Sequence, residues 1–132
     1  MEEKREDIQT IEDIKLLVDE FYGKVRLNPL IGPIFIGVIK DNWPAHLEKM
    51  YRFWGTVLLG HQSYVGHPFK PHAQLPVEQA HFDAWVGLWT ETVDRYFAGR
   101  VADEAKWRGD LMAKVFLSRI DDYRFSNRVP IV

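Results

Sequence analysis

The stretch WPAHLEKMYRFWGTVLLG, residues 43–60, has the pattern of an amphipathic helix and decides the fold class. Asn42 precedes it as a suitable N-cap, Pro44 suits a first helical turn, and Gly60 suits the C-terminal end. Apolar residues recur at helical spacing on two overlapping faces, one at Leu47, Met50, Trp54 and Val57, the other at His46, Met50, Phe53 and Val57. We therefore predict a helix that carries a histidine among its apolar residues.

Segments of the same kind lie on both sides of this stretch. Over residues 10–28, Thr10 and Asp13 fit a capping box, and an apolar stripe at helical spacing follows until a proline stops it. The same spacing predicts a helix over residues 77–97 and a last helix from about Ala102. The chain is thus predicted to be all-α.

The connecting segments are irregular in composition. Residues 30–39 are apolar but contain two glycines and a proline, which favours a buried irregular connector or short helical turns over a strand without a partner. Residues 61–76 are rich in Gly, Pro and His and are predicted to be a long loop, the kind of segment that often carries function. Residues 1–9 and 124–132 are predicted to be loose termini of a single domain over residues 1–132.

The composition argues against several classes of protein. The net charge is −2 with no long run of one sign, so no nucleic-acid partner is expected. No apolar run approaches the ~18 residues of a membrane helix, and the acidic start does not resemble a secretory signal, so we expect a cytoplasmic protein with no membrane contact. The chain has no Cys, which excludes disulfides, thiolate nucleophiles and cysteine-based metal sites.

Four residues suggest chemistry when they are taken together. Aromatic residues make up 14% of the chain, which suits either a large aromatic core or the lining of a flat apolar ligand. His46 falls on a helix face, His72 in the long loop, and Tyr22 and Trp85 on or beside apolar stripes. Each alone is more typical of an ordinary core or loop residue. As a set they meet the needs of haem, which takes one neutral imidazole and apolar walls.

The chain also resembles the third group of truncated haemoglobins. The resemblance covers about residues 10–120, and no single motif in it is diagnostic, but the ordered set is specific. Its segments are Phe21-Tyr22, Gly32–Phe35, Trp43–Trp54, Leu58–Gly60, Tyr64–His72 and His81–Trp85. The resemblance implies a truncated globin fold, a two-over-two helical sandwich that encloses haem b.

Residue roles follow from the resemblance. It implies that His72 is the iron ligand, that His46 is the distal histidine, and that Tyr22 and Trp85 are distal hydrogen-bond donors. It implies a haem lining formed by Phe35, Phe53, Trp54, Leu75 and Phe82. Pro71 stands before the iron ligand, where the second group usually has Arg. The candidates for the haem propionates are therefore Lys49, Arg52, Tyr64, His67 and Lys70.

The polar distal set predicts tight binding of dioxygen or another diatomic ligand rather than transport. One hydrogen bond to a charged acceptor is worth about 1.5–3 kcal/mol, which slows ligand escape on the order of ten- to a hundredfold. The same donors suit oxidation of nitric oxide or a slow peroxidase reaction, with His46 moving the proton. The sequence does not choose between them, and an enzyme activity stays open. A reductase of unknown identity would return the iron to its ferrous state, and the resemblance implies a monomer. Whether His46 itself binds the iron is also open.

Two other classes of protein remain as alternatives. One is a non-haem helical interaction domain whose Trp and Phe residues only fill the core. The other is a zinc hydrolase that would use His61, His67, His72 or His81. A catalytic zinc site usually has three close protein ligands, and no His pair at helical spacing with a Glu between occurs here.

Overall fold

The computed structural model describes residues 4–62 and 77–128, with side chains described up to residue 120. Within those ranges all regular structure is helical, as the sequence predicts. The helices are α1 (Ile11–Leu27), α2 (Gly32–Ile39), α3 (Trp43–Leu59), α4 (Gln79–Tyr96) and α5 (Arg100–Arg128). None of these described helices is both long enough and apolar enough to cross a membrane.

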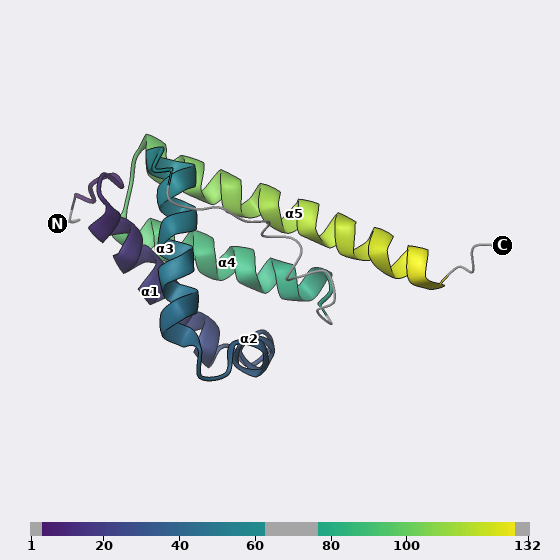
Figure 1. Cartoon of the computed structure of the whole chain (residues 1–132). Coiled ribbons are helices and arrows are strands. Elements are labelled where there is room, and N and C mark those ends of the chain that lie inside the picture. Colours follow the sequence, from purple (N-terminus) through teal and green to yellow (C-terminus); the bar gives the residue numbers. More distant parts are fainter. Residues whose placement is uncertain (1–3, 63–76, 129–132) are drawn as a thin grey trace.

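The helices pack as two pairs. Helix α4 lies along α5, and α1 and α3 pack against each other on the other side of the core (Figure 1). Helix α1 also contacts α4, and α3 contacts α5 where the two pairs cross. Helix α2 packs mainly against α1. This is the two-over-two arrangement expected from the sequence.

Local sequence explains where the long helices begin. Thr10 accepts a hydrogen bond from the Asp13 backbone N–H, and the Asp13 carboxylate accepts from Thr10, so the predicted capping box is present at α1. Pro44 lies in the first turn of α3, and Gly60 ends that helix with a left-handed φ of 75°. The predicted bounds of α4 and α5 agree with the structure to within two residues at each of the starts.

Trp89 of α4 fixes how α4 meets α5. Its side chain is 1% exposed, and its indole N–H donates to the Ala105 carbonyl oxygen of α5 at 2.9 Å. The indole fits because Gly109 has no side chain. A Cβ there would lie 2.5 Å from Cδ1 and 2.8 Å from Nε1 of Trp89. Gly109 is therefore needed for the close approach of these two helices.

Asp7 and Ile8 are held against the start of α5, contrary to the prediction that they belong to a loose terminus over residues 1–9. Ile8 is 2% exposed, and the Asp7 carboxylate accepts hydrogen bonds from the backbone N–H groups of Val101 and Ala102 at 3.0 and 2.8 Å. Burial of Asp7 acts to raise its pKa, but these bonds, one from Ile8 and the nearby Arg100 outweigh it and lower the pKa. Asp7 thus caps α5 from 94 residues away.

Residues 30–39 form short helical turns, one of the two predicted alternatives, since they contain the eight-residue helix α2, although only Gly32 of that helix is buried. Pro33 suits its first turn, and a Cβ at Gly32 would lie 2.8 and 2.9 Å from the Arg26 and Val25 carbonyl oxygens. The predicted loose tail over residues 124–132 is wrong for residues 124–128, which continue α5. No proline or glycine interrupts the sequence there.

We expect Gly109→Ala to lower the free energy of unfolding by about 1–3 kcal/mol, because the new methyl group would overlap the Trp89 indole. Gly87→Ala is the matched control. Gly87 is exposed within α4 and nothing lies within 4 Å of the Cβ position, so this change should stabilise by about 0.5–1 kcal/mol. Urea unfolding measures both. Equal stability of the two variants would contradict the tight crossing.

Candidate functional site

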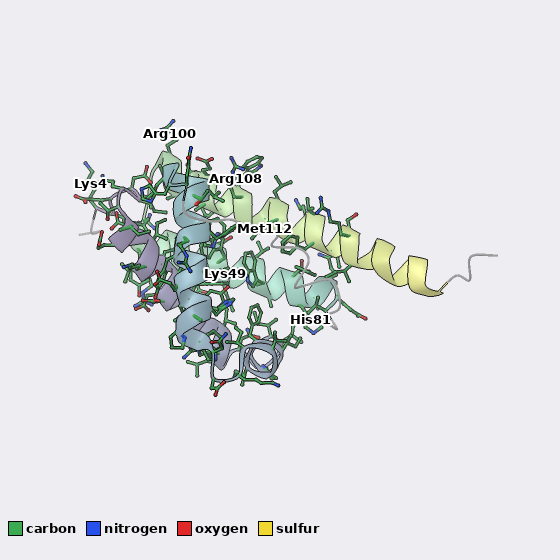
Figure 2. All side chains as sticks on the ribbon, in the orientation of Figure 1. Lys4, Lys49, His81, Arg100, Arg108 and Met112 are labelled. Atoms are coloured by element: carbon green, nitrogen blue, oxygen red, sulfur yellow. The ribbon has the colours of Figure 1, made fainter. Side chains whose placement is uncertain are left out.

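A mostly apolar cavity of about 200 Å³ lies among all five helices. Its walls come from Tyr22 of α1, from α2, and from the facing sides of α3, α4 and α5. Lys49 on α3, His81 on α4 and Met112 on α5 mark three of these walls (Figure 2). The cavity therefore depends on the crossing angle that the two helix pairs adopt.

Most described candidates for haem contact lie on the cavity wall. They are Phe35, Lys49, Phe53, Trp54 and Phe82. Arg52 is exposed and is not among the described lining residues, since it lies on the outer side of α3 next to the inward Phe53. Tyr64, His67, Lys70, His72 and Leu75 lie outside the described residues.

The three candidate distal residues also line this cavity. Tyr22 and His46 contact each other edge-to-face, with ring centroids 5.0 Å apart and an interplanar angle of 86°. Trp85 reaches the same cavity from α4, with its ring centroid 5.3 Å from that of Phe21. The structure thus brings together side chains that are 63 positions apart in the sequence, from Tyr22 to Trp85.

Trp43 and Arg26 support the Tyr22–His46 pair from outside. Trp43 meets Tyr22 and His46 edge-to-face at centroid distances of 5.9 and 5.8 Å. The Arg26 guanidinium carbon lies 3.7 Å from the centroid of the Trp43 ring, a close cation–π contact. Three rings in mutual contact restrict how far the His46 imidazole can turn. Trp43 and Arg26 were not predicted as site residues, because their pairing depends on the angle between α1 and α3.

Tyr22 keeps its phenolic proton in this setting. Its side chain is 6% exposed, and burial raises the pKa of the hydroxyl above its usual value. The neutral hydroxyl is a hydrogen-bond donor as well as an acceptor. Tyr22 can therefore donate to a small polar ligand in the cavity.

Several wall residues were not predicted as site residues. They include Ile34, Val38 and Ile39 of α2, Met50 of α3, Val77, and Met112, Ala113 and Phe116 of α5. Because residues 30–39 show no regular helical spacing of apolar residues, the sequence did not indicate which side of α2 would face the cavity. Met112 and Phe116 carried only a core-like pattern, which does not separate a packed side chain from one that lines a cavity.

His81 has a capping role and also lines the cavity. Its Nδ1 accepts a hydrogen bond from the Glu78 backbone N–H at 3.0 Å at the start of α4. His61 is exposed, beyond the end of α3. Among the side chains described in residues 4–62 and 77–120, no group of three His, Asp or Glu residues could hold a metal ion. His67 and His72, the other members of the zinc alternative, lie outside the described part of the chain.

These features together define a small protein whose described part is all-helical and encloses a mostly apolar cavity with a polar aromatic group on its wall. A model of the bacterial-like globin family matches residues 6–115. The chain is 33% identical over 116 residues to the group 3 truncated haemoglobin of Campylobacter jejuni, which covers 85% of this chain and 91% of that protein. The chain therefore belongs to the bacterial-like globin family and to its third group of truncated haemoglobins.

Solved structures agree with this placement. The crystal structure of a group III truncated haemoglobin from Campylobacter jejuni matches with a TM-score of 0.81 and 30% identity, over 89% of this chain and 95% of that one. The X-ray structure of a truncated oxygen-avid haemoglobin from Bacillus subtilis matches with a TM-score of 0.70 and 26% identity, over 82% and 93%. The predicted truncated globin fold is confirmed.

Membership of a globin family implies haem binding, and the described walls fit such a group. Phe35, Phe53 and Phe82 offer apolar aromatic faces on α2, α3 and α4. Lys49 is exposed at the cavity, so its ammonium could meet a carboxylate at the rim. The globin family therefore favours haem binding over the non-haem interaction domain.

The buried phenol gives a prediction about alkaline stability. The folded pKa of Tyr22 lies above its unfolded value of ~10, so its contribution is fully present below pH ~10 and is lost as pH rises further. Above pH ~10 the free energy of unfolding should fall with a slope of up to ~1.4 kcal/mol per pH unit from this group. Tyr22→Phe should remove that part of the slope.

Urea unfolding between pH ~8 and ~11 measures this slope, with Tyr96→Phe as the control. Tyr96 is partly exposed on α4 and does not line the cavity among the described residues. The same alkaline slope in both variants would contradict the buried, neutral state of Tyr22.

Proposed function

We propose that this chain binds haem b and holds a diatomic ligand such as dioxygen tightly beside Tyr22, His46 and Trp85. The observation that carries the proposal is that these three side chains, from α1, α3 and α4, meet at one mostly apolar cavity. Bound haem supplies a ferrous iron that takes up the diatomic ligand. The proposed protein ligand of that iron is His72. In support, Val77, five residues after His72, is buried at the cavity wall.

The three polar side chains have complementary abilities. The Trp85 indole N–H can only donate a hydrogen bond, and the neutral Tyr22 hydroxyl donates from a buried position. His46 can donate or accept according to its protonation. Two donors aimed at a partly negative ligand would each add about 1.5–3 kcal/mol to binding. Such a site suits retention rather than the ready release that transport requires.

The same polar group suits redox chemistry, which is the second part of the proposal. Oxidation of nitric oxide or slow reduction of peroxide would use Tyr22 and Trp85 to polarise the reacting oxygen atoms. His46, in ring contact with Tyr22, would move the proton. The similar Bacillus subtilis haemoglobin is described as oxygen-avid, which supports tight binding here.

The remaining roles follow from position. We propose Lys49 as a contact for a haem propionate. Among the described residues that line the cavity, it is a lysine whose side chain is also exposed to solvent. Tyr64, His67, Lys70 and the exposed Arg52 remain candidates for the same role. We also propose a cytoplasmic monomer that works with a separate reductase, and we leave open whether His46 binds the iron when no ligand is present.

We expect Tyr22→Phe and Trp85→Phe each to raise the dioxygen dissociation rate about ten- to a hundredfold, because each removes one donor worth about 1.5–3 kcal/mol. Stopped-flow displacement of dioxygen from the ferrous protein measures the rate. Tyr96→Phe, which removes a hydroxyl from α4 outside the described lining, should leave the rate unchanged. A fast dissociation rate in the parent protein that neither cavity variant changes would contradict tight binding by these donors.

A further inference from the structure

Three indole rings stack in the middle of the molecule. Trp85 lies nearly parallel to Trp89, with ring centroids 6.0 Å apart and planes inclined by 12°. Trp89 in turn stacks on Trp54 of α3 at 4.4 Å and 22°. Both outer rings, Trp85 and Trp54, line the cavity. Indoles are among the most easily oxidised side chains, so an oxidant in the cavity would face a continuous run of electron donors.

The middle ring, Trp89, has a carbonyl oxygen and no base as the hydrogen-bond acceptor of its indole N–H. The Trp89 indole N–H donates to the Ala105 carbonyl oxygen at 2.9 Å, in a position that is 1% exposed. A backbone carbonyl is far too weak a base to take that proton. An oxidised Trp89 would therefore keep its proton, stay strongly oxidising and take an electron from a neighbouring ring.

Tyr51 stands where an electron could come from. It precedes Trp54 by three residues on α3, which places the two Cβ atoms about 5–6 Å apart. Its ring is partly buried and packs against the core cluster that contains Trp54. Tyr51 thus links the buried indoles to the molecular surface between α1 and α3.

Tyr51 also has a base in contact with its hydroxyl. The phenolic O–H donates a hydrogen bond to the Asp19 carboxylate of α1. Burial, the bond to Asp19 and the nearby Glu48 raise the pKa of Tyr51 to about 12, so the resting phenol keeps its proton. Lys15 lies with its Nζ 5.8 Å from the ring centroid on the same surface. The proton therefore moves to Asp19 only when the phenol is oxidised and becomes strongly acidic.

We propose that Trp85, Trp89, Trp54 and Tyr51 form a relay that carries an oxidising equivalent from the cavity to the surface, with Asp19 as the proton acceptor. In its last step one electron passes from Tyr51 to the oxidised Trp54, the phenolic proton passes to the Asp19 carboxylate, and a neutral tyrosyl radical remains. The first electron passes to a one-electron oxidant in the cavity, which bound haem would supply by reacting with hydrogen peroxide, so this first step rests on the proposed haem binding. The relay goes beyond ligand binding and does not depend on which diatomic ligand the cavity holds.

The test follows radicals within the polypeptide after pulse radiolysis with dibromide radicals, which oxidise tryptophan. All variants are made in a background protein, which is the full-length chain with Trp107→Phe. It is used as purified, and any haem that it carries is kept ferric. Trp107 is 57% exposed and would otherwise react first. We expect the indolyl-radical absorption to decay as a tyrosyl-radical absorption grows. Adding Tyr51→Phe should abolish most of that growth, while adding Tyr96→Phe should leave it unchanged.

Asp19→Asn tests the transfer of the phenolic proton and leaves the rings of Tyr51 and Trp54 unchanged. It keeps the Tyr51 hydroxyl but removes the base, so the tyrosyl absorption should grow more slowly than in the background protein. In the background protein deuterium oxide should also slow this growth. Trp89→Phe tests the stack and should slow the transfer as well. Urea unfolding shows that each variant is folded.

Three results would overturn the relay. These are no growth of the tyrosyl absorption in the background protein, equal growth with and without Tyr51, and a rate that neither Asp19→Asn nor Trp89→Phe changes. None of these readouts uses ligand binding at the iron. A failure of the relay is therefore distinguishable from a failure of the proposed ligand-binding function, which the dissociation rates test.

Discussion

The indole of Trp89 is the contact through which α3, α4 and α5 hold one another. It stacks on Trp54 of α3, donates its N–H to Ala105 of α5, and occupies the space that a side chain at position 109 would fill. The edge of Phe21 from α1 completes its surroundings, with a centroid distance of 5.1 Å. A buried polar N–H with its acceptor in place tolerates few other arrangements, because an unmade bond costs about 1–3 kcal/mol. The crossing of the two helix pairs, and hence the cavity between them, depends on this ring.

The cavity combines apolar walls with a polar end, and the two parts have different origins. The apolar walls come from the inner faces of α2, α3, α4 and α5. Without a ligand in the cavity, these apolar faces would be driven to pack against one another to leave contact with water. The polar end comes from Tyr22, His46 and Trp85, which line the cavity while their aromatic rings pack against neighbouring rings as core residues do. Trp43, covered by Arg26, keeps this end in shape from outside.

The sequence predicts those features of the fold that depend on neighbouring residues. Helix α1 begins at its Thr10 capping box, and α3 follows from its apolar spacing between Asn42 and Gly60. Contacts between distant segments were not predictable in this way. The cap that Asp7 places on α5 spans 94 residues, and no local pattern marks it.

Some residues of the candidate site could likewise be predicted from the sequence, and others could not. Tyr22, His46 and Trp85 were chosen from the sequence, and the structure places all three on one cavity. Arg52 was chosen from the same helix as Phe53 but lies on its exposed side, because one step along a helix turns a side chain by about 100°. His81 was considered only as a metal ligand, whereas it caps α4 and lines the cavity.

We propose above that the cavity holds haem with His72 as the protein ligand of its iron. The most direct test is the absorption spectrum of the full-length protein, purified after expression with ample haem, beside His72→Ala and the control His61→Ala. His61 is exposed and is not among the described lining residues. We expect a Soret band in the parent and in His61→Ala that is lost or moved in His72→Ala. A colourless parent protein, or a spectrum that His72→Ala leaves unchanged, would contradict it.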